Sequence, residues 1–121
     1  MTMKKVLVVD DSLTDLTNIK NIVSAAGYLV FTATSGQEAL DIAKTEKPDM
    51  IFLDIIMPDQ DGFGTCRKLA AGSETKGIPV VFVSSKNQKV DRLWGQLQGA
   101  KGYVVKPYTP QEIMDQLHAL A

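Results

Sequence analysis

The sequence is poor in residue types whose abundance would mark other classes of protein. Its 121 residues contain a single cysteine, Cys66, which excludes an internal disulfide and is best interpreted as a small core hydrophobe. Aromatic residues make up only 7%, and no stretch is densely basic. The wide positive surface that binds nucleic-acid backbones is therefore missing, and we predict no direct nucleic-acid binding.

Long apolar runs are missing as well. The run that follows Lys4 and Lys5 is far shorter than that of a signal peptide or a membrane helix, and it ends in two aspartates. The net charge of -1 and the 45% apolar content fit one compact core. These features predict a single domain over residues 1–121 that is cytoplasmic and not inserted in a membrane.

Five short apolar runs alternate with longer segments of helical periodicity. Nearly continuous apolar runs are typical of strands that are covered on both faces. The predicted strands are residues 5–9, 29–33, 50–53, 80–83 and 102–105. This alternation predicts an α/β fold, a doubly wound five-stranded parallel sheet with helices on both faces. We favour the strand order 2-1-3-4-5, because five strands are too few for the common six-strand arrangement.

Capping residues indicate where several helices begin, namely Ser12, Ser35, Asp61 and Thr109. The fourth predicted helix carries apolar residues at i, i+3, i+4 and i+7, which are Val90, Leu93, Trp94 and Leu97. Trp94 fits two interpretations, because it could fill the core beneath this helix or bind a partner.

Charged residues follow three of the predicted strands at the point where each strand ends. Asp10 and Asp11 follow the first strand, Asp54 the third and Lys106 the fifth, while Ser84 ends the fourth. Because the carboxyl ends of parallel strands share one edge of a sheet, we expect these side chains to converge. Three carboxylates in one pocket need cations, and all-oxygen ligands favour Mg²⁺ over zinc. A carboxylate beside such a metal can attack phosphorus and become an acyl phosphate.

These motifs resemble those of the receiver domains of two-component response regulators, the CheY-like family. The resemblance covers the whole chain and is carried by Val-Val-Asp-Asp-Ser at residues 8–12, Asp-Ile-Ile-Met-Pro at 54–58 with Asp-Gly at 61–62, Pro-Val-Val-Phe-Val-Ser at 79–84, and Lys-Pro at 106–107. It implies a flavodoxin/CheY-like fold and a phosphoryl-accepting regulator in a phosphorelay. The phosphodonor would be a histidine kinase, and the protein would not be a turnover enzyme.

The resemblance also implies a role for individual residues. Asp54 would accept the phosphoryl group, and Lys106 and Ser84 would hold its oxygens. Asp11, Asp54 and the backbone carbonyl of Ile56 would bind Mg²⁺ directly, and Asp10 would do so through water. Ser84 and Tyr103 would report phosphorylation to a protein target on the surface formed by the fourth helix, fifth strand and fifth helix. The Lys106–Pro107 peptide bond would be cis.

Within the family, residues 91–100 are similar to the stand-alone regulators of type IV pilus twitching motility, the PilH type. Trp94 with Gln98 and Gly99 carries this narrower similarity. It implies a role in pilus motility or chemotaxis-type signalling, in which the protein would regulate a partner or drain phosphoryl groups from a shared kinase.

Three other functions fit the same topology. A flavodoxin-like electron carrier must cradle the FMN phosphate in its first loop, where Asp10 and Asp11 would repel it. An aspartate-nucleophile phosphatase normally has a second aspartate two residues after the nucleophile, and here that residue is Ile56. The third alternative is a docking module of the same fold that is never phosphorylated.

Overall fold

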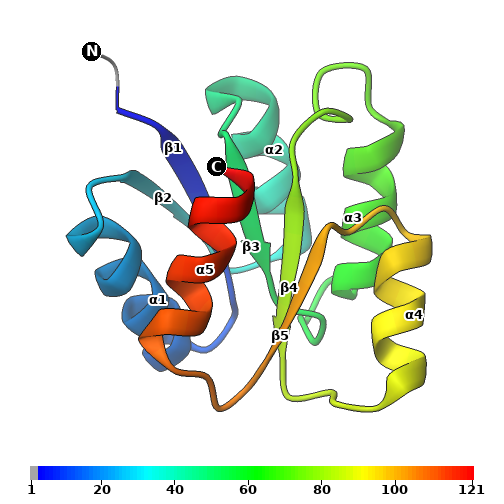
Figure 1. Ribbon diagram of the computed structural model, residues 1–121. Coiled ribbons are helices and arrows are strands. Elements are labelled where there is room, and N and C mark those ends of the chain that lie inside the picture. Colours follow the sequence, from blue (N-terminus) through cyan, green and yellow to red (C-terminus); the bar gives the residue numbers. More distant parts are fainter. Residues whose placement is uncertain (1–2) are drawn as a thin grey trace.

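The computed structural model describes residues 3–121 and places five strands in one parallel sheet (Figure 1). The strands are β1 (Lys5–Val9), β2 (Leu29–Ala33), β3 (Met50–Leu53), β4 (Val80–Ser84) and β5 (Gly102–Val105). Their order in the sheet is β2-β1-β3-β4-β5, and every neighbouring pair is parallel. This confirms the predicted fold class and strand order, and β4 extends one residue beyond its predicted end to include Ser84.

Five helices connect the strands: α1 (Leu13–Ala25), α2 (Gly36–Glu46), α3 (Gly62–Ala71), α4 (Lys89–Leu97) and α5 (Pro110–Leu120). The four predicted caps are present. The side chains of Ser12, Ser35, Asp61 and Thr109 each accept a hydrogen bond from a backbone amide in the first turn. These bonds satisfy amides that have no partner within the helix. They therefore fix the residue at which each helix begins after the preceding strand.

The helices form one layer on each face of the sheet (Figure 1). α1 and α5 cover one face, and α2, α3 and α4 cover the other. Side chains that alternate along a strand enter opposite layers, as the pleat requires. In β1, Val6 and Val8 pack toward α1 and α5, whereas Leu7 and Val9 pack toward α2 and α3. Helices therefore cover both faces of the sheet, which is why its strands consist mostly of apolar residues.

Helix α4 presents its apolar residues to solvent. Val90, Leu93 and Trp94 are about half exposed, and Leu97 is 77% exposed. The face that contacts the sheet carries Gly95, where a β-carbon would lie 2.9 Å from the ring of Phe82. The interpretation of Trp94 as a core residue is therefore wrong. A glycine on the inner face lets the helix approach the sheet closely and leaves the bulky residues outside.

Candidate functional site at the carboxyl ends of the strands

The sheet's hydrogen bonds continue one residue past three strands and fix the residues that follow. The backbone amide of Asp10 donates to the carbonyl of Ala33 at 3.1 Å, and that of Asp54 donates to Val9 at 3.0 Å. The amide of Lys106 donates to the carbonyl of Ser84 at 2.9 Å. Each charged side chain thus leaves the backbone at a position set by the neighbouring strand, on the edge that the sequence predicted. The Lys106–Pro107 bond is cis, as expected.

Three carboxylates converge at this edge. One oxygen each from Asp10, Asp11 and Asp54 lies within 4.8 Å of the other two. Asp10 and Asp54 are buried, and Asp11 is exposed. Backbone amides orient both buried groups: Ser12 donates to Asp10 Oδ1 at 2.9 Å, and Ile55 donates to Asp54 Oδ1 at 2.8 Å. Each buried carboxylate keeps its second oxygen, Oδ2, for other partners.

The donor set fits Mg²⁺. Hard divalent ions take oxygen ligands, and at the usual bond length of about 2.1 Å the ligands of one Mg²⁺ ion lie roughly 3 to 4 Å apart. The three carboxylate oxygens lie within 4.8 Å of one another, so a small side-chain movement or one bridging water is enough to bring all three into reach of one ion. No histidine or cysteine belongs to this group, which disfavours zinc.

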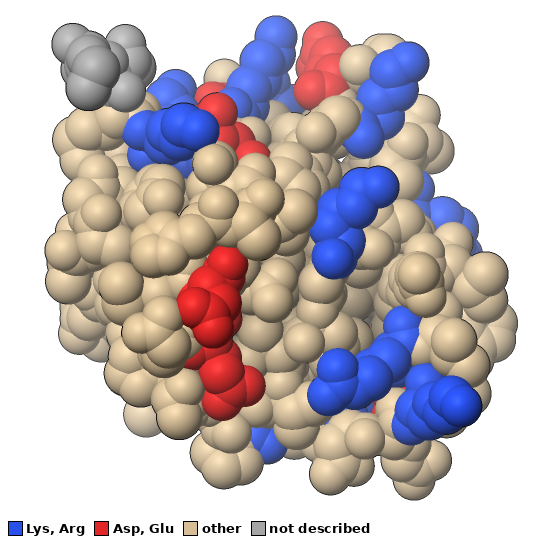
Figure 2. Space-filling view, in the orientation of Figure 1, with Lys and Arg blue, Asp and Glu red and all other residues tan. Residues whose placement is uncertain are grey.

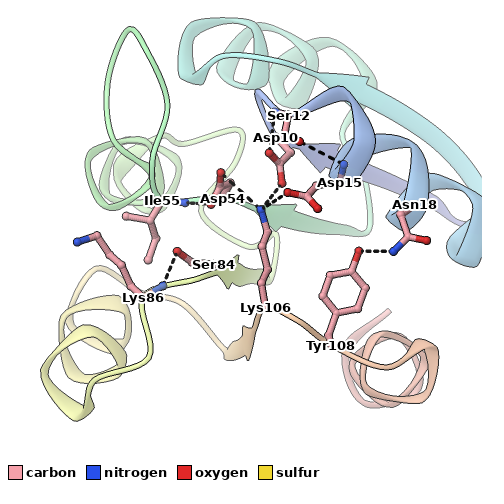
Figure 3. A network of polar contacts seen from close by, with 10 residues as sticks. All are labelled: Asp10, Ser12, Asp15, Asn18, Asp54, Ile55, Ser84, Lys86, Lys106 and Tyr108. Carbon is pink, nitrogen blue, oxygen red and sulfur yellow. Dashed lines mark hydrogen bonds and ion pairs between the residues drawn. The ribbon is translucent and has the colours of Figure 1, made fainter.

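Lys106 lies at the centre of the acidic residues (Figure 3). Its Nζ is 2.8 Å from Asp10 Oδ2, 2.9 Å from Asp15 Oδ2 and 3.8 Å from Asp54 Oδ2. Burial by itself would lower the pKa of Lys106, but the hydrogen bonds to Asp10 and Asp15 and the charge of Asp54 outweigh that effect. The net result is a pKa above the usual lysine range, so the ammonium is charged at neutral pH.

The pKa of Asp54 is raised to about 6, first by burial and then by the negative charge of Asp10. Lys106 and the amide of Ile55 oppose this rise only in part. Near neutral pH the carboxylate is nevertheless mostly ionised, as a nucleophile must be. Ionised Asp54 is therefore destabilised in the folded protein, and an added cation would relieve it.

Ser84 and Tyr103 meet at one residue of the loop between β4 and α4. Ser84 is fully buried, and its Oγ accepts a hydrogen bond from the amide of Lys86 at 3.3 Å. The Tyr103 hydroxyl donates to the carbonyl of Lys86 at 2.7 Å. The two predicted switch residues thus hold the same peptide segment, one from the site and one from β5. Ile56, whose backbone carbonyl is the remaining predicted metal ligand, turns its side chain to solvent with 56% exposure.

The prediction from sequence missed Asp15. This residue lies in the first turn of α1, where its amide donates to the capping hydroxyl of Ser12 at 3.4 Å. A capped first turn points its third residue back toward the preceding loop. The spacing of Asp15 from Ser12 was the one signal that could have placed its carboxylate beside the pocket.

Comparison with known proteins agrees with this geometry. Residues 6–118 match the response regulator receiver domain. The chain belongs to the response regulator receiver family. It is 36% identical over 118 residues to the protein PilH of Pseudomonas aeruginosa, covering 98% of each chain. Receiver domains are signalling modules of two-component systems that take phosphate from histidine kinases.

Two further receiver proteins show how widely the domain is shared. The alkaline phosphatase synthesis transcriptional regulatory protein PhoP of Bacillus subtilis is 37% identical over 117 residues, although the chain spans only 48% of its length. The chemotaxis protein CheY4 of Vibrio cholerae has a solved structure that superposes with a TM-score of 0.93 at 32% identity, covering 99% of this chain and all of that one. The predicted CheY-like, PilH-type resemblance is therefore confirmed. Over residues 3–121, no helix of this receiver is long and apolar enough to cross a membrane.

Proposed function

We propose that this receiver, a single domain over residues 1–121, accepts a phosphoryl group on Asp54 from a histidine kinase. The observation that carries the proposal is the convergence of Asp10, Asp11 and Asp54 around the ammonium of Lys106. Charged residues that only stabilise the fold need neither an aspartate with a raised pKa nor a carboxylate oxygen that is free of backbone hydrogen bonds. Asp54 has both features.

In the transfer, one oxygen of Asp54 forms a bond to phosphorus while the bond from phosphorus to the donor's imidazole nitrogen breaks. The electron pair of the broken bond returns to that nitrogen. Lys106 and the Ser84 hydroxyl hold phosphoryl oxygens that carry negative charge in the transition state. Asp10, Asp11, Asp54 and the carbonyl of Ile56 would hold Mg²⁺, which when bound neutralises charge on the same oxygens.

We propose that Lys86 transmits phosphorylation to α4. A Ser84 hydroxyl that turns toward a phosphoryl oxygen gives up its bond to the amide of Lys86. The loop that Tyr103 holds through the carbonyl of the same residue is then free to shift. Because this loop leads directly into α4, the position of the helix changes with the state of Asp54.

The target face is the exposed apolar row of α4 with the adjoining surfaces of β5 and α5. Basic residues flank that row, among them Lys89, Arg92 and Lys101, and Figure 2 shows basic side chains gathered over the region where Figure 1 places α4. Apolar side chains with basic neighbours suit a partner helix that carries apolar anchors and acidic flanks. Because the chain is similar to PilH, we propose pilus motility as its setting. There it would either regulate a partner protein or drain phosphoryl groups from a shared kinase.

Acetyl phosphate with Mg²⁺ provides the direct test. Mass spectrometry should show one phosphoryl group added to the intact protein, and peptide mapping should place it on Asp54. EDTA should abolish the modification. Asp54→Asn should prevent it, and Asp59→Asn, a matched change in an exposed aspartate that caps α2, should leave it intact. Modification at another residue would refute the assignment of Asp54. No modification of the parent protein would refute the proposal and favour the unphosphorylated docking module.

A further inference from the structure

The shortest contacts of Lys106 are not with Asp54, the residue that we propose to be phosphorylated. Its ammonium lies within hydrogen-bond distance of Asp10 and Asp15, whereas the 3.8 Å to Asp54 is too long for a hydrogen bond. In Figure 3 the carboxylates of Asp10 and Asp15 lie to one side of the ammonium and Asp54 lies to the other. The resting lysine is thus drawn toward α1.

Asp15 differs from the other carboxylates in having no further task at the site. Asp10 is oriented by the amide of Ser12 and belongs to the group of oxygens that fits a metal. The Asp15 side chain does not belong to that group, and within residues 3–121 Lys106 is the one hydrogen-bond partner of its carboxylate. The Asp15 side chain is 38% exposed, so water reaches its ion pair with Lys106 without surrounding it.

A phosphoryl group on Asp54 would compete for the same ammonium. It brings additional negative charge and three acceptor oxygens to the position that Lys106 faces. The Lys106 ammonium has three N–H donors, and in the resting site two of them bond Asp10 and Asp15. To make more than one charge-assisted bond to phosphoryl oxygens, the ammonium must therefore give up one of these partners. Every bond that holds it toward α1 opposes that change.

We propose that Asp15 is a positioning residue that restrains Lys106 in the resting site and thereby lowers the stability of the phosphorylated state. The inference rests on the proposed function, because it concerns the lysine that would hold the phosphoryl group. On phosphorylation Lys106 exchanges Asp15 for a phosphoryl oxygen, and the carboxylate of Asp15 turns to solvent. Loss of Asp15 therefore favours the phosphorylated form.

The consequence is measured by the affinity for beryllium trifluoride, a noncovalent mimic of the phosphoryl group, in excess Mg²⁺. A partly exposed ion pair changes an equilibrium by about two- to fivefold, so Asp15→Asn should bind the mimic more tightly by that factor in isothermal titration calorimetry. Asp41→Asn is the matched control, because it removes the same charge from an exposed position on α2 whose side chain bonds only Gln37 among the described residues. It should not change the affinity.

A double-mutant cycle separates restraint from simple charge repulsion. In a Lys106→Met background Asp15→Asn should have no effect, because the residue it restrains is gone. An equal gain in both backgrounds would overturn the proposal, since it would show that Asp15 acts through its charge alone. An Asp15→Asn affinity equal to that of Asp41→Asn would overturn it as well.

A second measurement examines the restraint in the resting protein and does not depend on phosphoryl chemistry. Hydrogen exchange of the Lys106 ammonium, followed by ¹⁵N NMR, should be faster in Asp15→Asn and unchanged in Asp41→Asn. Unchanged exchange in Asp15→Asn would refute the restraint. If the parent protein bound no mimic but ammonium exchange still responded to Asp15, the proposed function would fail while the contact itself stood.

Discussion

Replacing Asp54 with asparagine should stabilise the metal-free protein at neutral pH. The Asp54 side chain is 8% exposed, and burial together with Asp10 raises its pKa from 3.8 to about 6. Such a rise means that the folded protein binds the proton more tightly than the unfolded chain does. Ionising Asp54 therefore costs folding free energy, and an uncharged residue of the same shape avoids that cost.

The size of the effect follows from the shift. Two pKa units correspond to about 3 kcal/mol, at 1.36 kcal/mol each. Asparagine can still accept the hydrogen bond from Ile55 through Oδ1, so little else is lost. At pH 7 we expect Asp54→Asn to raise the free energy of unfolding by about 1 to 3 kcal/mol.

The pH dependence has a definite sign. Below pH 3.8 the carboxyl is protonated in both states, so parent and variant should be equally stable. As the pH rises from 3.8 to 6, the parent loses stability relative to the variant, and above pH 6 the difference is constant. Urea unfolding in EDTA, followed by far-UV circular dichroism across this range, measures the difference directly.

A variant that is less stable than the parent at pH 7, or a difference that does not change with pH, would refute this reasoning. Asp41→Asn again serves as the control, because its side chain is exposed. It should show no comparable pH-dependent gain.

Three further predictions concern α4 and the metal site. Gly95→Ala should destabilise the protein by about 1 kcal/mol in urea unfolding, because the new methyl group meets Phe82 and overpacking outweighs the better helix propensity of alanine; a more stable variant would contradict the close approach. Leu97→Ala should change the free energy of unfolding by less than about 0.5 kcal/mol, whereas Leu69→Ala, in the core, should cost about 2 to 5 kcal/mol; equal losses would contradict the outward orientation of Leu97. Mg²⁺ should raise the melting temperature of the parent protein, and Asp11→Asn should reduce that rise if the carboxylate cluster binds the ion.

Much of the fold could be predicted because its signals are local. Continuous apolar runs gave four of the five strands at their observed bounds, and capping residues such as Ser35 and Thr109 marked helix starts. Parallel strands then placed Asp10, Asp54 and Lys106 at a common edge. The strand and helix predictions used preferences that a short segment carries by itself, and the common edge followed from the general geometry of parallel sheets.

The sequence by itself determined which residues form strands, where several helices begin and which charged groups lie at the strand ends, because periodicity and capping act within a few residues. Only the tertiary structure decided that Lys106 bonds Asp10 and Asp15 more closely than Asp54, and that α4 turns Gly95 inward and Leu97 outward. A helical period shows which residues share a face but not which way that face turns. Contacts within 4 Å depend on how separate elements pack, and here the fit of α1 and α4 against the sheet sets them.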